Sequence, residues 1–250
     1  MNKRTGDRER QTGEKREHAA TGGEPGHGIS RRAALGALGG IAASAVGLLE
    51  VGIPAFAGHD DGNRVGSAVR DRAGLGFVGQ FEQNDENFAG YGYLTSIRGL
   101  DTSSLFADTG QESVETARFT FYATALLVSR NVLGNVFAVD VEGDLSFFFQ
   151  ETGGATFSNP ESFRAGTVIA RDHLRLQDVL TVIAPNQGLP HLTGELTRTE
   201  ANKFVFEGRQ YRLGHKGLTS RLEATGTGTR TQINPLTTVV QIAGTTTGVE

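Results

Sequence analysis

The feature that most constrains this chain is a two-residue alternation of apolar and polar side chains in its later part. It is clearest over residues 117–128, where Phe119 and Phe121 fall on one face and Arg118 and Tyr122 on the other. Successive side chains of a β-strand point to opposite sides, so this period indicates strands with one buried face. Beyond residue 58 the sequence keeps no helical stripe for three turns. We therefore expect this part to be all-β.

Twelve stretches with this character are predicted as strands. They cover residues 75–82, 91–95, 117–128, 135–141, 145–150, 167–170, 174–184, 192–199, 203–206, 210–213, 221–229 and 238–243. Turn signals such as Glu142–Gly143 separate them. Short strands without helices to cover a parallel sheet favour an antiparallel architecture, and abundant glycine permits the bends that barrels need. The predicted fold is a single antiparallel β-barrel of about eight strands, with a β-sandwich as the alternative.

The first 57 residues differ from the rest in composition. Residues 1–32 mix charges of both signs and hold too little apolar surface to offset the entropy of ordering, so a disordered tail is expected. Arg31 and Arg32 then precede the 17 uncharged residues of segment 33–49, which is rich in Ala and Gly. A pair of arginines before such a run resembles a twin-arginine (Tat) signal peptide.

The resemblance implies where the chain is processed and where it goes. Ala55 and Ala57 fit an A-x-A cleavage site, so residues 1–57, including the signal helix, are expected to be removed. The partner implied is the twin-arginine translocase of a bacterium. The implied location is extracellular, periplasmic or in the cell envelope, with no stable membrane span after cleavage. A retained membrane anchor is the alternative. Residues 58–73 are then expected to be a flexible arm, and residues 74–250 the barrel domain.

Composition from residue 58 onward argues against several functions. Its 16 Lys and Arg against 22 Asp and Glu leave a formal charge of −6, which does not suit nucleic-acid binding. The chain has no cysteine, which excludes disulfides, thiolate metal sites and a cysteine nucleophile. No G-x-S-x-G or S-x-x-K motif indicates a serine hydrolase. No cofactor is expected.

Several patterns that resemble sites have structural explanations. Gly74–Gly79 matches G-x-G-x-x-G, but a strand follows where a dinucleotide site needs a helix, so strand glycines are expected. Asp140, Glu142 and Asp144 are expected to lie at a solvated hairpin tip rather than to bind calcium. No metal site is expected, because the histidines beyond residue 74 sit in none of the usual ligand spacings. These histidines are His173, His191 and His215.

A candidate ligand site comes from the polar and aromatic face of two predicted strands. Tyr91 and Tyr93 share one side of the first strand, and Arg118 and Tyr122 share the side opposite the phenylalanines on the second. If this face lines the barrel interior, it would hold a small ligand through a few polar groups in an otherwise apolar cavity. If the phenylalanine face is inside, these four residues meet solvent instead.

The function predicted from these features is non-enzymatic. We expect an exported barrel that binds a small apolar or amphipathic ligand, or a component of the cell envelope. One alternative is a metal-independent barrel enzyme, cyclase-like or isomerase-like, whose site is assembled from several strands; a carboxylate or histidine beside a tyrosine in a cavity would favour it. The other alternative is a structural surface protein, which predicts a filled barrel and an exposed apolar patch.

Overall fold

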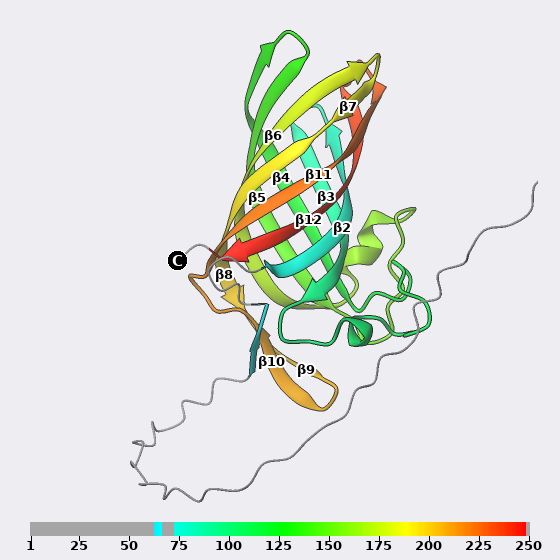
Figure 1. Ribbon diagram of the computed structural model, residues 1–250, viewed down its shortest axis with the longest axis vertical. Coiled ribbons are helices and arrows are strands. Elements are labelled where there is room, and N and C mark those ends of the chain that lie inside the picture. The colour runs from blue at the N-terminus through cyan, green and yellow to red at the C-terminus, as the bar shows by residue number, and fades with distance from the viewer. Residues whose placement is uncertain (1–62, 67–72, 249–250) are drawn as a thin grey trace, which may run out of the picture. The chain divides into compact units, whose positions relative to one another are not determined.

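The computed structural model describes residues 63–66 and 73–248 of the chain. Eight long strands form a closed ring in which each is antiparallel to its neighbours, and the last strand pairs with the first (Figure 1). The strands are β2 (Ala73–Asn84), β3 (Asn87–Ile97), β4 (Phe119–Leu133), β5 (Val136–Phe149), β6 (Thr167–Ala184), β8 (His191–Ala201), β11 (Thr219–Gln232) and β12 (Thr237–Gly248). Closure leaves no sheet edge of the kind a sandwich keeps. The predicted antiparallel β-barrel is confirmed.

The barrel has two different ends. At the upper end, tight hairpins join β2 to β3, β4 to β5 and β11 to β12, and β7 (Gln187–Leu189) follows the turn after β6 and leads into β8. At the lower end, longer connections carry the short helices η1 (Thr102–Leu105) and η2 (Pro160–Arg164). In the described part of the chain, no helix is both long and apolar enough to cross a membrane.

A second, small sheet lies at the lower end. It consists of β1 (Asn63–Val65), β10 (Arg209–Leu213) and β9 (Lys203–Phe206), with β1 parallel to β10. Strand β1 falls within residues 58–73, which were expected to be a flexible arm, so that expectation is wrong for Asn63–Val65. The signal-peptide residues Arg31, Arg32, Ala55 and Ala57 lie outside the described residues, and their roles remain predictions.

Two predicted interruptions do not exist. Glu142–Gly143 lies in the middle of β5, and the predicted stretches 167–170 and 174–184 are one strand, β6. For β5 the reason is local packing at Gly143, where a Cβ would come within 2.0 Å of the Thr124 carbonyl oxygen. This glycine permits a close approach between β5 and β4 rather than a chain reversal.

The phenylalanine face points into the barrel and fills its lower half. The rings of Phe77 and Phe121 meet edge to face with centroids 5.7 Å apart. Room for the Phe121 ring comes from Gly79 and Gly92, where a Cβ would lie 2.7 Å from the ring's Cζ atom. The hollow left among these side chains is only about 30 Å³. The lower barrel is therefore a packed core.

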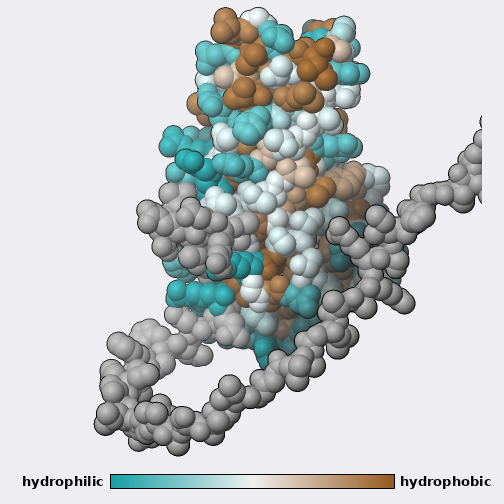
Figure 2. All heavy atoms as spheres, viewed as in Figure 1, coloured by the Kyte–Doolittle hydropathy of each residue, from teal (hydrophilic) through white to brown (hydrophobic). Residues whose placement is uncertain are grey.

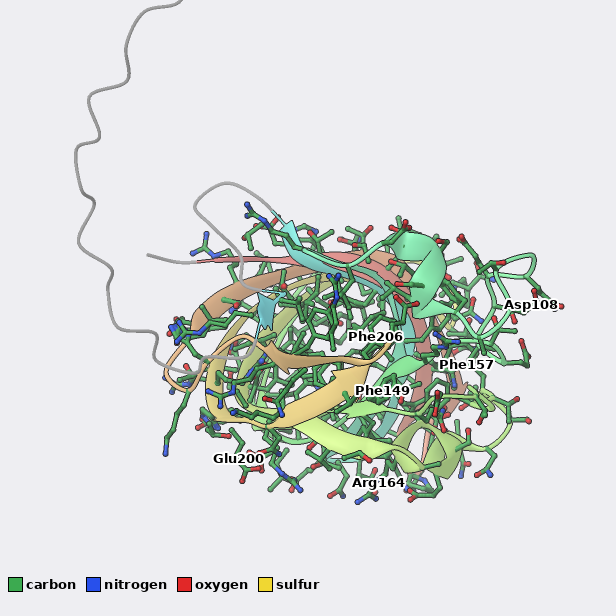
Figure 3. All side chains as sticks on the ribbon, turned by 90° about the horizontal axis from the view of Figure 1, so that it is seen from below. Asp108, Phe149, Phe157, Arg164, Glu200 and Phe206 are labelled. Atoms are coloured by element: carbon green, nitrogen blue, oxygen red, sulfur yellow. The ribbon has the colours of Figure 1, made fainter. Side chains whose placement is uncertain are left out.

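An aromatic cluster seals the lower end. The rings of Phe119 and Phe149 from the barrel contact those of Phe204 and Phe206 from β9, with centroid separations from 5.3 to 5.9 Å. Seen from below, Phe149 and Phe206 lie inside the ring of strands, whereas Arg164 and Glu200 lie at its periphery (Figure 3). The β9–β10 hairpin thus acts as a plug for this end.

A buried ion pair reinforces the plug. Asp172 of β6 and Arg198 of β8 both lie in the interior, and the guanidinium donates to both carboxylate oxygens, with Nη2 3.2 Å from Oδ2. Arg198 also donates to the Leu213 carbonyl oxygen at the end of β10 and stacks over Phe147 at 5.4 Å. Burial raises the pKa of Asp172, and the neighbouring guanidinium opposes that shift. The pair links two barrel strands to the plug.

Candidate functional site

The upper half of the barrel encloses a cavity of about 440 Å³. Its wall is mainly apolar because the two-residue period of β5 and β6 presents every second side chain to the interior. Gly188 and Gly228 oppose each other on β7 and β11, and the Leu180 side chain packs against Gly188, where a Cβ would lie 2.6 Å from the Leu180 Cδ1 atom. The apolar side chains of the wall are Phe81, Phe88, Phe137, Val139, Val141, Leu176, Leu180, Val182, Leu192, Leu236 and Val240.

Glu82 and Asp178 both border this cavity; the Glu82 carboxylate accepts from the Tyr91 hydroxyl, whereas the carboxyl of Asp178 belongs to the apolar wall. It lies on the same face of β6 as Leu176 and Leu180, and its Oδ1 atom is buried with no hydrogen-bond partner among the described residues. Burial raises the pKa of Asp178 to about 6, although the nearby His191 backbone and side chain favour the ionised form. Asp178 therefore exchanges its proton close to neutral pH.

Two arginines lie at the mouth of the cavity. Arg230 donates from Nε and Nη2 to the Asn186 side-chain oxygen, at 3.0 and 2.8 Å. Arg130 reaches the inner side because a β-bulge between Leu127 and Ser129 reverses the alternation of β4. The guanidinium groups give the mouth a positive charge, whereas the wall is otherwise mainly apolar, with Asp178, Gln83 and Thr238 among its polar residues.

A second hollow of about 800 Å³ lies beside the mouth. It shares Glu82, Gln83, Phe88 and Thr238 with the cavity wall and is otherwise lined mostly by polar residues of β2, β3, β4, β5, β11 and β12. Gln83 is buried and donates to the backbone oxygen of Asp85 at 2.6 Å, which fixes the hairpin between β2 and β3 at this side of the mouth. The apolar cavity thus opens toward a more polar surface.

Tyr91 and Tyr122, predicted as ligand-binding residues, lie on the outer face of the barrel. Tyr91 is fully buried there, beneath Phe157 and Phe163 of the connection that carries η2. Its hydroxyl donates to Glu82 Oε1 at 2.5 Å and accepts from the Gln80 amide at 2.7 Å. Burial and the Glu82 carboxylate raise the pKa of Tyr91 above its usual range. This cluster holds a connection against the barrel wall.

Tyr93 and Arg118 occupy the same outer side, nearer the lower end. The Tyr93 ring meets Phe106 edge to face at 6.2 Å. Arg118 donates to the Ser104 carbonyl oxygen at 3.3 Å and lies 5.8 Å from the centre of the Phe206 ring. None of the four predicted residues lines the cavity, because the phenylalanine face is the inner one. A ligand site formed by this set would have required the opposite orientation.

The carboxylates of β5 lie in the middle of a strand, so their predicted place at a hairpin tip is wrong. Asp140 accepts hydrogen bonds from Ser129 and Gln177, which hold the pKa of its carboxyl below its usual range. Glu142 lies 3.0 Å from His173 Nε2 on the outer face. Among the described residues no group of three or more His, Cys, Asp or Glu side chains is arranged to hold a metal.

The remaining patterns lie where the strands place them. Gly74–Gly79 belongs to β2, which confirms the prediction of strand glycines.

The residues that distinguish the cavity, Asp178, Arg130 and Arg230, were not among the predicted site residues. No protein-family model, curated protein or solved structure matches this chain. The cavity is therefore the observation from which a function has to be argued.

Proposed function

We propose that this protein binds a small amphipathic molecule with an anionic group. Its apolar part would fill the upper cavity, and its anionic group would pair with Arg130 and Arg230 at the mouth. The observation that carries the proposal is an apolar cavity of about 440 Å³ above a packed and plugged lower half. This size is typical of small-molecule sites, and guanidinium groups pair well with carboxylates and phosphates.

The interior also bears on the two alternatives. If the protein were a purely structural surface protein, we would expect a filled barrel, but the upper half of this barrel is hollow. If the protein were a metal-independent barrel enzyme, we would expect a carboxylate or histidine beside a tyrosine in its cavity. The described wall includes two residues with a carboxyl group, Asp178 and Glu82, and neither a tyrosine nor a histidine lines it; the Glu82 carboxylate accepts from Tyr91, which lies on the outer face. These features favour binding over catalysis.

Filling the cavity tests the proposal. The chain contains no tryptophan, so a single introduced indole both occupies space and reports on its surroundings. Val182 lines the cavity, whereas its neighbour Thr181 does not. With 11-(dansylamino)undecanoic acid as the fluorescent probe, we expect Val182→Trp to weaken binding about tenfold or more, since the indole takes the probe's place. Thr181→Trp is the matched control and should bind the probe like the unmodified chain.

The charge at the mouth is tested separately with the same probe. We expect Arg130→Gln combined with Arg230→Gln to reduce the preference for the free acid over its methyl ester, because the ester carries no charge to pair with a guanidinium. Far-UV circular dichroism checks that each variant keeps its strands. Equal binding by both tryptophan variants, or no binding of the acid by the unmodified chain, would contradict the proposal.

A second candidate, a metal-independent enzyme, is favoured by one observation. The pKa of Asp178 near 6 gives the cavity a group that can both donate and accept a proton near neutral pH. Asp178→Asn preserves the shape of the side chain and removes this exchange. Molecules extracted from the purified unmodified chain and from the variant would then be compared by mass spectrometry and chromatography. Isomers that differ between the two favour the enzyme, and identical molecules favour binding alone.

We further propose that the chain is exported through the twin-arginine pathway before it acts. The support is the sequence around Arg31 and Arg32 and the absence of cysteine, since a fold without disulfides can be completed before export. Replacing both arginines with lysine should keep the protein in the cytoplasm of a bacterium that has this translocase. Cell fractionation with an antibody measures the effect, and unchanged export of the variant would contradict the proposal.

A further inference from the structure

The upper rim of the barrel is unusually apolar for a surface. Exposed hydrophobic side chains stand on three turns around the mouth: those between β4 and β5, between β6 and β7 and between β11 and β12. They are Val132, Leu133, Ile183, Leu189 and Ile233, with Leu133 84% and Ile233 72% exposed. In Figure 2 hydrophobic residues gather at this upper end. Apolar side chains concentrated at one end of a protein mark an interaction surface.

The charges on the same three turns have one sign. Over residues 130–136, 182–189 and 229–237 the only charged residues are Arg130 and Arg230. Asp85 and Glu86 belong to the fourth hairpin, between β2 and β3, where the Asp85 carboxylate accepts from the Leu236 backbone N–H at 2.9 Å and is thereby engaged. The β2–β3 hairpin is shorter than the neighbouring β4–β5 hairpin. Strand β3 pairs with β4 only as far as Leu126, whereas β4 continues to Leu133. The protruding part of the rim is therefore both apolar and basic.

We infer that this rim docks on the surface of an anionic lipid bilayer. The apolar tips would enter the interfacial layer, and the two arginines would lie at the level of the lipid phosphates. Apolar side chains combined with basic ones are what binding to such a surface requires, since burial and attraction to anionic lipids add together. The cavity mouth then faces the membrane.

A second copy of this chain is a poorer occupant of the same surface. Two rims placed together would bring the arginines of both copies close to one another, and the three protruding turns hold no carboxylate to pair with them. An anionic bilayer supplies the missing negative charge. Docking does not depend on the ligand, but if the proposed function holds, an amphipathic molecule could pass between the bilayer and the cavity without crossing water.

The test uses the full chain and a probe placed on the rim itself. Leu133→Trp introduces the only tryptophan of the chain at the most exposed rim position. With vesicles of phosphatidylglycerol and phosphatidylcholine in equal parts, we expect its emission to shift to the blue and to be quenched by brominated lipids. Val205→Trp is the matched control, because Val205 is also exposed, at 63%, but lies on β9 at the opposite end. Its emission should stay unchanged.

The electrostatic part is tested with charge variants. In the Leu133→Trp background, Arg130→Gln with Arg230→Gln should weaken vesicle binding about tenfold or more, and vesicles of phosphatidylcholine alone should bind weakly. Arg209→Gln, an exposed arginine beyond β9, is the control and should have little effect.

Three results would overturn the inference. The first is an unshifted tryptophan at position 133. The second is an equal shift at positions 133 and 205, which would indicate contact through some other part of the chain. The third is a dimer in sedimentation equilibrium that Leu133→Trp disrupts while vesicles leave the emission unchanged, which would assign the rim to a second copy. Binding of the dansyl acid in solution is measured without vesicles, so failure of docking and failure of ligand binding are distinguishable.

Discussion

The two halves of the barrel are built from the same strands but have opposite interiors. In the lower half, phenylalanine and leucine side chains leave a hollow of about 30 Å³, whereas the upper half encloses about 440 Å³. The difference comes from how the inward side chains meet. In the lower half the Phe121 ring occupies the space left by Gly79 and Gly92, whereas in the upper half Phe81, Phe88 and Phe137 border the cavity without closing it. Whether a barrel of this size is filled or hollow thus depends on a few side chains that point inward.

The two halves also differ in whether their buried carboxyl groups have partners. In the lower half, Asp172 is paired with Arg198, and the guanidinium has further partners in Leu213 and Phe147. In the upper half, Asp178 keeps a buried oxygen without a partner among the described residues. A satisfied ion pair suits a structural plug, and an unsatisfied carboxyl in an apolar cavity suits a site. The lower half thus has the features of a stable core, and the upper half has those of the proposed binding site.

The largest expected effect is loss of the ion pair in the lower half. Arg198→Met leaves Asp172 buried without a counter-charge, and we expect it to lower the free energy of unfolding by about 3 to 5 kcal/mol. Urea unfolding followed by circular dichroism measures the change. Replacing both residues, with Asp172→Leu and Arg198→Met together, should recover most of the loss, because no unpaired charge then remains.

The control for this variant is Arg175→Met. Arg175 is exposed and lies 3.7 Å from Glu142 on the outer face of the barrel. Exposed pairs contribute little, so a change of less than about 1 kcal/mol is expected. Equal effects at Arg198 and Arg175 would show that the buried pair is not what holds the plug.

The next prediction compares how much stability is lost when one phenylalanine side chain is removed from each half. Phe121→Ala opens a cavity in the packed layer beside Gly79 and Gly92, with an expected cost of about 3 to 5 kcal/mol. Phe137 is only partly buried and borders the hollow, so Phe137→Ala should cost about 1 to 2 kcal/mol. Thermal and urea unfolding measure both. Similar costs would mean that the upper half is packed in solution and that the cavity closes.

The sequence predicted the strands because their signal is local. The alternation around Phe119 and Phe121 identified β4 and the face that packs, and the orientation of the phenylalanines follows from burial of large apolar surface. Closure of the ring was expected only from the number of strands and their glycine content. The pairing of β12 with β2 joins residues far apart in the chain, and no local pattern encodes it.

The candidate site was missed for two reasons. The bulge between Leu127 and Ser129 changes the parity of β4, so the pattern read from Phe119 and Phe121 would place Arg130 outside. Asp178 did leave a signal, because it falls at a two-residue spacing from Leu176 and Leu180 on an apolar face. A carboxyl at such a position is costly to bury and therefore informative. The predicted strand over residues 174–184 already contained all three positions, so this signal was present in the sequence.

The smallest of these effects concerns Asp178 and depends on pH. Its pKa is about 6 in the folded chain against an ordinary value of 3.8. Between these values the folded state binds more protons than the unfolded state, so the free energy of unfolding decreases as the pH rises through this window. Asp178→Asn removes the cost of the buried charge and should stabilise the chain by about 1 to 3 kcal/mol above pH 6.

Below about pH 3 the same substitution should have little effect, because the carboxyl is then protonated in both states. Asp144→Asn is the matched control, since Asp144 is an exposed carboxyl on the outer face of β5, and it should change stability little at either pH. The measurement is urea unfolding of the three chains at several pH values. A stabilisation by Asp178→Asn that is constant over this range would show that Asp178 carries no shifted charge. The upper half would then lose the carboxyl group that distinguishes its wall from the apolar packing below.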